Sequence, residues 1–145
     1  MVKAIIVLLI TLLFLMCGAA SANDLENDPL AKRCINLFEI YKNNDLSAYV
    51  NGFPDEVVAI LGEDFLKTEL NNKHNKFEKN YNSAPKEIRI KSIENIQPHP
   101  TAVERIGVEE SRKVFISVKG VNSGLQGSCS FNRIKTKWYF RDTPL

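Results

Sequence analysis

The stretch DPLAKRCINLFEIY, residues 28–41, decides the fold. Asp28 is a favourable helix N-cap, and Pro29 suits the first helical position because it has no N–H group to leave unpaired. The apolar side chains recur at helical spacing and form one stripe, which consists of Leu30, Cys34, Leu37, Phe38 and Tyr41. The pattern therefore predicts a helix that buries this stripe and turns Cys34 toward the core.

Two further helices are predicted before residue 82. Residues 43–45 (NND) end the first helix and cap a short helical turn after it. A second helix starts at Pro54 and stops at Gly62, and a third covers residues 63–81, because apolar residues return every three or four positions in both. Their apolar positions are Val57, Val58, Ile60, Leu61, Leu66, Leu70, Phe77 and Tyr81.

The remainder of the chain, residues 86–141, alternates between apolar and polar residues as strands do. A bulge near Ser92 reconciles a break in the alternation, and turns are expected at residues 98–100 around His99 and at residues 122–124. The expected strands are 88–96, 102–108, 114–118, 125–131 and 137–141. Helices first and strands second predict a single α+β domain, with N-terminal helices packed on an antiparallel sheet of four to five strands.

Residues 1–22 have the pattern of a cleavable secretory signal. Lys3 precedes an uncharged run at residues 4–16, and the small residues 20–22 (ASA) form a cleavage site. The run is shorter than the roughly 20 apolar residues that span a bilayer, so no stable membrane span is expected after cleavage. We expect a periplasmic or secreted domain of residues 23–145. In the alternative of a bacterial lipoprotein, Cys17 becomes a lipidated N-terminus, although Met16 before it is large.

Cleavage removes Cys17 and leaves Cys34 and Cys129. In an oxidising compartment these two have one possible intramolecular pairing, and the alternative is two separate buried thiols. A bridge across 95 residues would stabilise the fold by about 4–5 kcal/mol in the chain-entropy model. Cys129 shares a strand face with Phe131, and this is the face that the first helix is expected to cover. We expect no metal site and no cofactor.

Charge excludes one class of function. Without residues 1–22 the chain carries 18 basic and 17 acidic residues, which is not the electrostatic footprint of a nucleic-acid-binding protein. A local basic set does occur near the end of the chain, at Arg133, Lys135, Lys137 and Arg141. It is interpreted either as a charged rim that protects sheet edges or as a patch for an acidic partner.

Two segments resemble the nuclear-transport-factor-2-like, cystatin-like superfamily. The first is Phe38-x-x-Tyr41-x-x-x-Asp45-Leu46, which is similar to the opening of those domains. The second is the ending Phe131-x-x-Ile134-x-x-x-Trp138-Tyr139-Phe140, which is similar to their closing hairpin. The resemblance implies a cone of helices within a curved sheet, and pairing of two copies through the exposed sheet face. Fold alone does not choose among the enzymes, ligand binders, scaffolds and toxin-neutralising partners of this superfamily.

An enzymatic interpretation rests on His74. The resemblance implies an acid–base pair inside the cone, in which a buried His74 imidazole near Asp45 or Asp64 would act as the general base. The alternative is a half-exposed histidine on a helix flank among Lys73, Asn75 and Lys76, with no chemical role. The possible pocket residues are His74, Phe38, Phe77, Phe131 and Trp138.

The sequence contains no glycine-rich phosphate loop and no catalytic motif. We therefore predict a small exported, non-catalytic binding protein, and not an enzyme. A bacterial immunity or envelope-accessory role follows from the resemblance alone. The competing hypothesis is an enzyme or carrier that uses the cone pocket and His74 on a small apolar ligand.

Overall fold

The computed structural model describes residues 22–82, 84–120 and 124–145, which form six helices and four strands. The helices are α2 (Ala22–Asn27), α3 (Pro29–Asn43), α4 (Leu46–Val50), α5 (Asp55–Leu61), α6 (Glu63–Tyr81) and α7 (Pro100–Ile106). The strands are β1 (Glu87–Ile96), β2 (Val108–Lys119), β3 (Gly124–Ile134) and β4 (Lys137–Asp142). The predicted signal peptide and most of the predicted turn at 122–124 lie outside the described residues.

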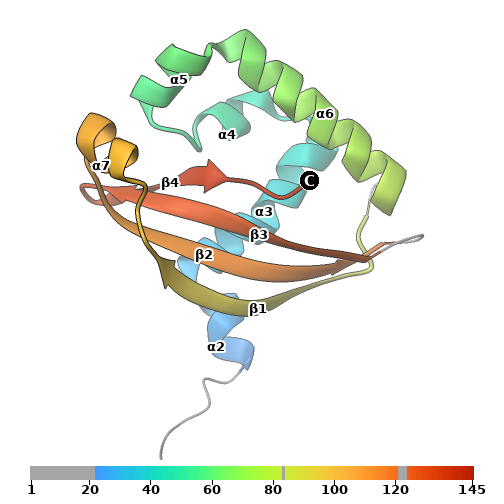
Figure 1. Ribbon diagram of the computed structural model, residues 1–145. Helices are drawn as coiled ribbons and strands as arrows, with labels where there is room; N and C mark the ends of the chain where they lie inside the picture. The colour runs from blue at the N-terminus through green and yellow to red at the C-terminus, as the bar shows by residue number, and fades with distance from the viewer. Residues whose placement is uncertain (1–21, 83, 121–123) are drawn as a thin grey trace, which may run out of the picture.

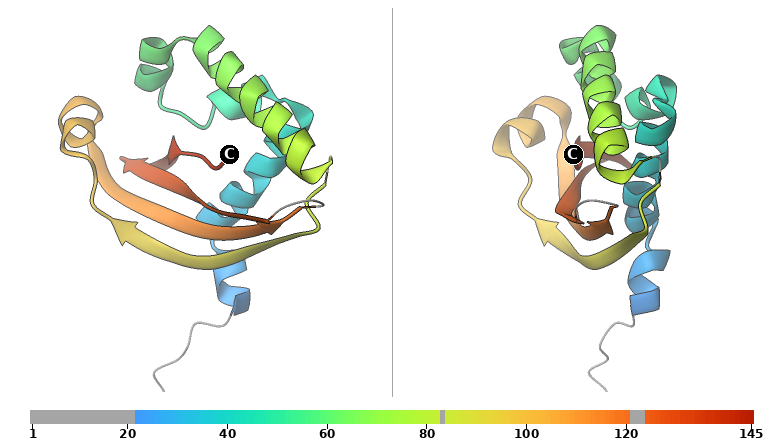
Figure 2. Two further views of the ribbon diagram at one scale, coloured as in Figure 1. Left: turned by 45° about the vertical axis from the view of Figure 1, so that its right-hand side comes forward. Right: turned by 90° about the vertical axis from the view of Figure 1, so that its right-hand side faces the viewer.

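The four strands form one antiparallel sheet in the order β1-β2-β3-β4. The sheet is strongly curved and does not close on itself, and α3 crosses one of its faces (Figure 1). α6 packs against α3, on the side away from β1, as the two turned views show (Figure 2). The predicted α+β class, with helices on a curved antiparallel sheet, is confirmed.

α3 forms as the sequence predicts. The Asp28 side chain accepts hydrogen bonds from the backbone N–H groups of Leu30 (2.7 Å) and Ala31 (3.3 Å), which would otherwise lack partners in the first turn. Asn44, in the left-handed conformation at φ 51°, ends the helix. The whole predicted stripe is buried, so the helix contributes one continuous apolar face to the core.

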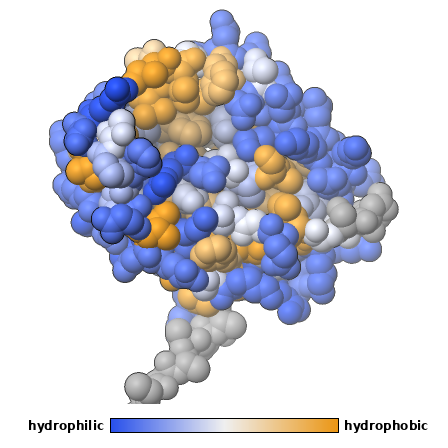
Figure 3. Space-filling view, in the orientation of Figure 1, coloured by the Kyte–Doolittle hydropathy of each residue, from blue (hydrophilic) through white to orange (hydrophobic). Residues whose placement is uncertain are grey.

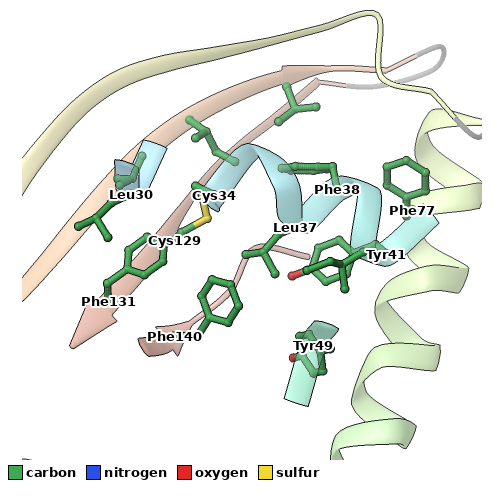
Figure 4. Packing of buried hydrophobic residues seen from close by; sticks show 14 of the residues in the cluster. Leu30, Cys34, Leu37, Phe38, Tyr41, Tyr49, Phe77, Cys129, Phe131 and Phe140 are labelled. Atoms are coloured by element: carbon green, nitrogen blue, oxygen red, sulfur yellow. A yellow bond between two sulfur atoms is a disulfide. The ribbon is translucent and has the colours of Figure 1, made fainter. Parts of the chain in front are cut away.

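The disulfide between Cys34 and Cys129 joins α3 to β3, which confirms the predicted pairing (Figure 4). The two Cα atoms are 5.8 Å apart, and neither side chain is exposed. Aromatic rings continue the core on both sides of the bridge. Phe38 contacts Phe77 with ring centroids 6.3 Å apart, and Phe131 contacts Phe140 at 5.4 Å. The core is therefore covalently and sterically tied at its centre.

The chain after β4 is held between α3 and α6. The Tyr41 hydroxyl donates a hydrogen bond to the carbonyl oxygen of Pro144 (3.0 Å), and the Lys73 ammonium donates to the carbonyl oxygen of Leu145 (3.0 Å). Lys73 itself is buried. Burial lowers the pKa of Lys73 and raises that of Tyr41.

Each of three strands contains a register shift with one extra residue. The shift in β1 falls between Ile90 and Ser92, which confirms the predicted bulge and makes Lys91 the extra residue. The extra residue is Glu109 in β2 and Arg141 in β4. A bulge re-aims the side chain of the residue that it adds. All three added side chains are charged, so the bulges place charges where regular pairing would not.

The predicted strand at 102–108 is wrong, because residues 100–106 form α7. Pro100 occupies the first turn, and the His99 side chain accepts a hydrogen bond from the backbone N–H of Thr101 (3.3 Å). Gly107 ends the helix with a left-handed φ of 68°. The proline and glycine have their usual positions at the start and end of a helix, and here they outweigh the β-branched residues. The sheet therefore has four strands in the described part of the chain.

Candidate functional site: an apolar groove between α5 and α7

The exposed apolar side chains gather at one end of the molecule. Among the described residues, the large hydrophobic side chains classed as exposed are Ile60, Leu61, Phe65 and Val103. They belong to α5, the first turn of α6, and α7, and Figure 3 shows an apolar area over α5 and the start of α6. Ile60 is 74% exposed and Phe65 is 51% exposed. A local concentration of this kind is typical of an interaction surface.

A hollow of about 440 Å³ lies between these helices, and we call it the α5–α7 groove. α5 provides one wall through Val57 and Ile60. α7 provides the opposite wall, and Asn132 and Arg141 from β3 and β4 complete the lining. The α7 residues and the preceding turn contribute His99, Thr101, Ala102, Arg105 and Ile106.

α5 owes its exposure to its position in the chain. It follows Pro54 and ends at Gly62, whose φ of 81° turns the chain sharply into α6. None of its residues is fully buried, although Val57 and Val58 are partly covered. The sequence predicted this helix and its apolar residues, but an amphipathic pattern does not reveal whether the apolar side faces the core or a partner.

The groove is positively charged. Arg105 on α7 and Arg141 on β4 both line it, and neither forms an ion pair with another described residue. No lining residue is acidic. The acids of α5, Asp55 and Glu56, lie in its first turn and are exposed. Arg141 reaches the groove because it is the extra residue of the β4 bulge, and its guanidinium donates a hydrogen bond to the Gln97 carbonyl oxygen (3.4 Å).

A smaller hollow of about 160 Å³ adjoins the groove and shares Arg141 with it. Leu61 and Phe65 line this second hollow, together with Lys73, Glu69 and Asp142, the last residue of β4. The apolar surface therefore continues past the groove from α5 onto α6. The combined surface is broader than the α5–α7 groove alone.

The predicted pocket residues lie elsewhere. Phe38, Phe77 and Phe131 are at most 2% exposed and belong to the packed core. His74 is half-buried, and its Nδ1 lies 2.7 Å from the carbonyl oxygen of Tyr41. Its contact is therefore with the backbone of α3. Trp138 is half-buried on β4, with the Arg112 guanidinium 5.2 Å from the centre of its ring.

The structure separates the predicted basic set. Arg133 forms ion pairs with Glu110 (3.3 Å) and Glu109 (3.7 Å). Lys135 and Lys137 are exposed around the β3–β4 turn, and Arg141 alone lines the groove. Sequence reasoning missed Arg105 because it assigned residues 102–108 to a strand. The signal that would have placed it on a helix is the segment HPTAVERIG, with proline at its start and glycine at its end.

The described residues contain no group of three or more His, Cys, Asp or Glu side chains that could hold a metal ion. In the same part of the chain, no helix combines the length and apolar character needed to cross a membrane. No protein-family model matches this chain, and a search of curated proteins finds no match.

Proposed function

We propose that this chain is a small exported, non-catalytic binding protein that docks a partner protein at the α5–α7 groove. The observation that carries the proposal is the clustering of the exposed large hydrophobic side chains on α5, α6 and α7. Removing such side chains from water is favourable by roughly 25 cal/mol for each Å² of apolar surface, and this gain offsets the entropy that association costs. By contrast, Leu66, Leu70 and Phe77, further along α6, are buried in the core.

A partner protein fits this surface better than a small apolar ligand does. Small-molecule sites enclose about 70–90% of their ligand in a concave pocket. Ile60 is 74% exposed, and Leu61 and Phe65 lie beyond the groove, so a molecule filling 440 Å³ would leave much of the apolar area in water. A protein partner covers about 800 Å² on each side of a standard interface. That footprint is wide enough to include both hollows.

The disulfide supports the proposed compartment. Structural disulfides form and persist in the periplasm and outside the cell, and the bond between Cys34 and Cys129 is buried. The signal pattern at residues 1–22 points to the same place. Within that compartment we propose an immunity or envelope-accessory role, in keeping with the resemblance to the nuclear-transport-factor-2-like superfamily.

The test is chemical crosslinking in periplasmic extract with three forms of the protein. These are the wild type, the double variant Ile60→Ser/Phe65→Ser, and the control Lys79→Ser, whose exposed side chain lies in the last turn of α6, at the other end of that helix from Phe65. We expect the wild type and the control to capture the same partner, and the double variant to lose it. A wild-type protein that remains uncrosslinked at micromolar concentration contradicts the proposal, as does capture that is unchanged in the double variant.

A further inference from the structure

We infer that the segment bound in the α5–α7 groove is an amphipathic helix of the partner whose carboxylates meet Arg105 and Arg141. This inference rests on the proposed function and specifies the chemistry of the partner. Charge complementarity, groove shape and the hydrogen bonding of the neighbouring strand support it separately.

The charge argument starts from the two arginines. Arg105 lies on one wall and Arg141 on the floor, and among the described residues neither has an ion-pair partner. By contrast, Arg112 and Arg133 in the same sheet both pair with Glu110. A guanidinium presents a planar fork of donors that matches a carboxylate. The groove therefore has two such forks beside an apolar wall, and no acid in its lining neutralises them.

The shape argument concerns the walls. The apolar residues of α5 that line the groove, Val57 and Ile60, are three positions apart, and those of α7, Ala102 and Ile106, are four apart. Each wall is thus a single helical stripe that faces the other. A third helix with anchors at the same spacing fills the space between two such stripes, which is the helix-in-groove mode of recognition.

The hydrogen bonding of β4 disfavours an extended segment. Of the two edge strands of the sheet, β1 and β4, only β4 contributes to the groove lining, so a strand bound in the groove would have to pair with the edge of β4. There the backbone N–H of Phe140 already donates to the carbonyl oxygen of Gly52 (2.7 Å). Because this donor is occupied, a partner strand cannot pair with that part of the edge. A helix satisfies its own backbone groups and needs no free edge.

The position of Arg141 is set before binding. The β4 bulge places it, and the segment that follows it is tied down by Tyr41 and Lys73 at Pro144 and Leu145. A binding group that is already held in position loses less entropy when the partner arrives. We therefore expect Arg141 to contribute more to affinity than Arg105, which lies on a seven-residue helix.

The experiment is a selection from displayed helical peptides that have fixed apolar anchors and randomised polar positions. Selection is against the wild-type protein, with affinities then measured by fluorescence anisotropy. We expect enriched Asp and Glu on one flank of the helix. We also expect about tenfold weaker binding to Arg141→Glu, which corresponds to about 1.4 kcal/mol. The control Lys79→Glu makes the same charge change on an exposed residue in the last turn of α6, away from the groove, and should leave affinity unchanged.

A charge exchange gives the sharpest readout. The selected peptide with its acids replaced by Lys should bind the Arg105→Glu/Arg141→Glu variant more tightly than it binds the wild type. Peptides that need Ile60 but carry neutral or basic flanks would overturn this inference and leave the proposed function standing. If no selected peptide is lost in Ile60→Ser/Phe65→Ser, both proposals fail. Dimerisation of the wild type that Ile60→Ser abolishes would assign the groove to a second copy of this chain.

Discussion

The centre of the molecule and its α5–α7 end use the same kinds of apolar residue for different purposes. α6 shows this within one helix, since Phe77 is 1% exposed against the core while Phe65 is 51% exposed at the other end. At the centre, the sheet and α6 cover every large side chain of the α3 stripe, and the disulfide joins α3 to β3. At the α5–α7 end nothing in the described chain covers them. Apolar residues at helical spacing thus identify buried positions only when another element packs over them.

The disulfide is expected to make the largest single contribution to the stability of the centre. Replacing Cys34 and Cys129 by Ala together should lower the free energy of unfolding by about 4 kcal/mol, because the unfolded chain regains the freedom of a 95-residue separation. Urea denaturation of the variant and the wild type measures the difference. Reductant should weaken the wild type by a similar amount and leave the variant unchanged. Equal stability of all forms would show that packing alone holds the centre.

The two phenylalanines of α6 test the contrast directly. Phe77→Ala should cost about 3–5 kcal/mol, because it removes a buried ring and leaves a cavity. Phe65→Ala should change stability by no more than about 0.5 kcal/mol, because its ring is already half in water. Both are measured by urea denaturation of otherwise identical proteins. Similar losses would mean that the α5–α7 end belongs to the core.

The sequence correctly predicted those parts of the fold that depend on local residue patterns and on the pairing of the two cysteines. The caps of α3, its buried stripe, α6, the β1 bulge and the single possible disulfide all followed from residue types and spacing. α7 did not, although Pro100 and Gly107 mark its ends. In a segment of seven residues, Val103 and Ile106 fit a strand as well as a helix, so periodicity alone could not decide.

The groove could not be predicted, because its residues come from separate parts of the chain. Ile60, Arg105 and Arg141 meet only after the sheet has curved and α7 has folded. Arg141 also depends on a bulge, which has no signal of its own in the segment WYFRD. The sequence did single out Arg141, but as a member of a basic set that the structure divides. Arg141 lines the groove because of the register shift between β3 and β4.

A close approach at Gly52 links the centre to the end of β4. A Cβ atom at this position would overlap the ring of Phe140. Gly52→Ala should therefore cost about 1–3 kcal/mol, as overpacking does in other cores. The control is Gly124→Ala, where the nearest atom to the added Cβ is the Val118 carbonyl oxygen at an ordinary 3.7 Å. Thermal unfolding of both variants distinguishes a steric requirement from a general sensitivity to added methyl groups.

Alkaline pH should weaken the centre. Burial raises the pKa of Tyr41, Tyr49 and Tyr81 above their ordinary value of 10.0. Above pH 10 the unfolded chain loses these protons while the folded chain keeps them, so stability falls by about 1 kcal/mol per pH unit for each tyrosine. Lys73 acts in the opposite direction, because burial lowers its pKa and the unfolded chain holds its proton longer. Three tyrosines against one lysine leave a net loss of stability.

The measurement for this effect is a pH series of urea denaturations, read together with the ultraviolet absorbance of tyrosinate. The variant Tyr41→Phe should show a shallower decline above pH 10 than the wild type. If all tyrosines ionised near pH 10 while the protein kept its native circular dichroism, the proposed effect of burial on Tyr41 and Tyr49 would be wrong.

The held C-terminal segment has a consequence for the order of events during synthesis. The helices that precede residue 82 are made first, yet the residues that cover them include Cys129, Phe131, Phe140 and Pro144. A ribosome releases these residues only when nearly the whole chain has been made. Folding of the centre therefore waits for the last part of the chain, and until then the apolar face of α3 is available to chaperones. Premature truncation before β4 would remove Phe140 and Pro144 and so leave part of that face uncovered.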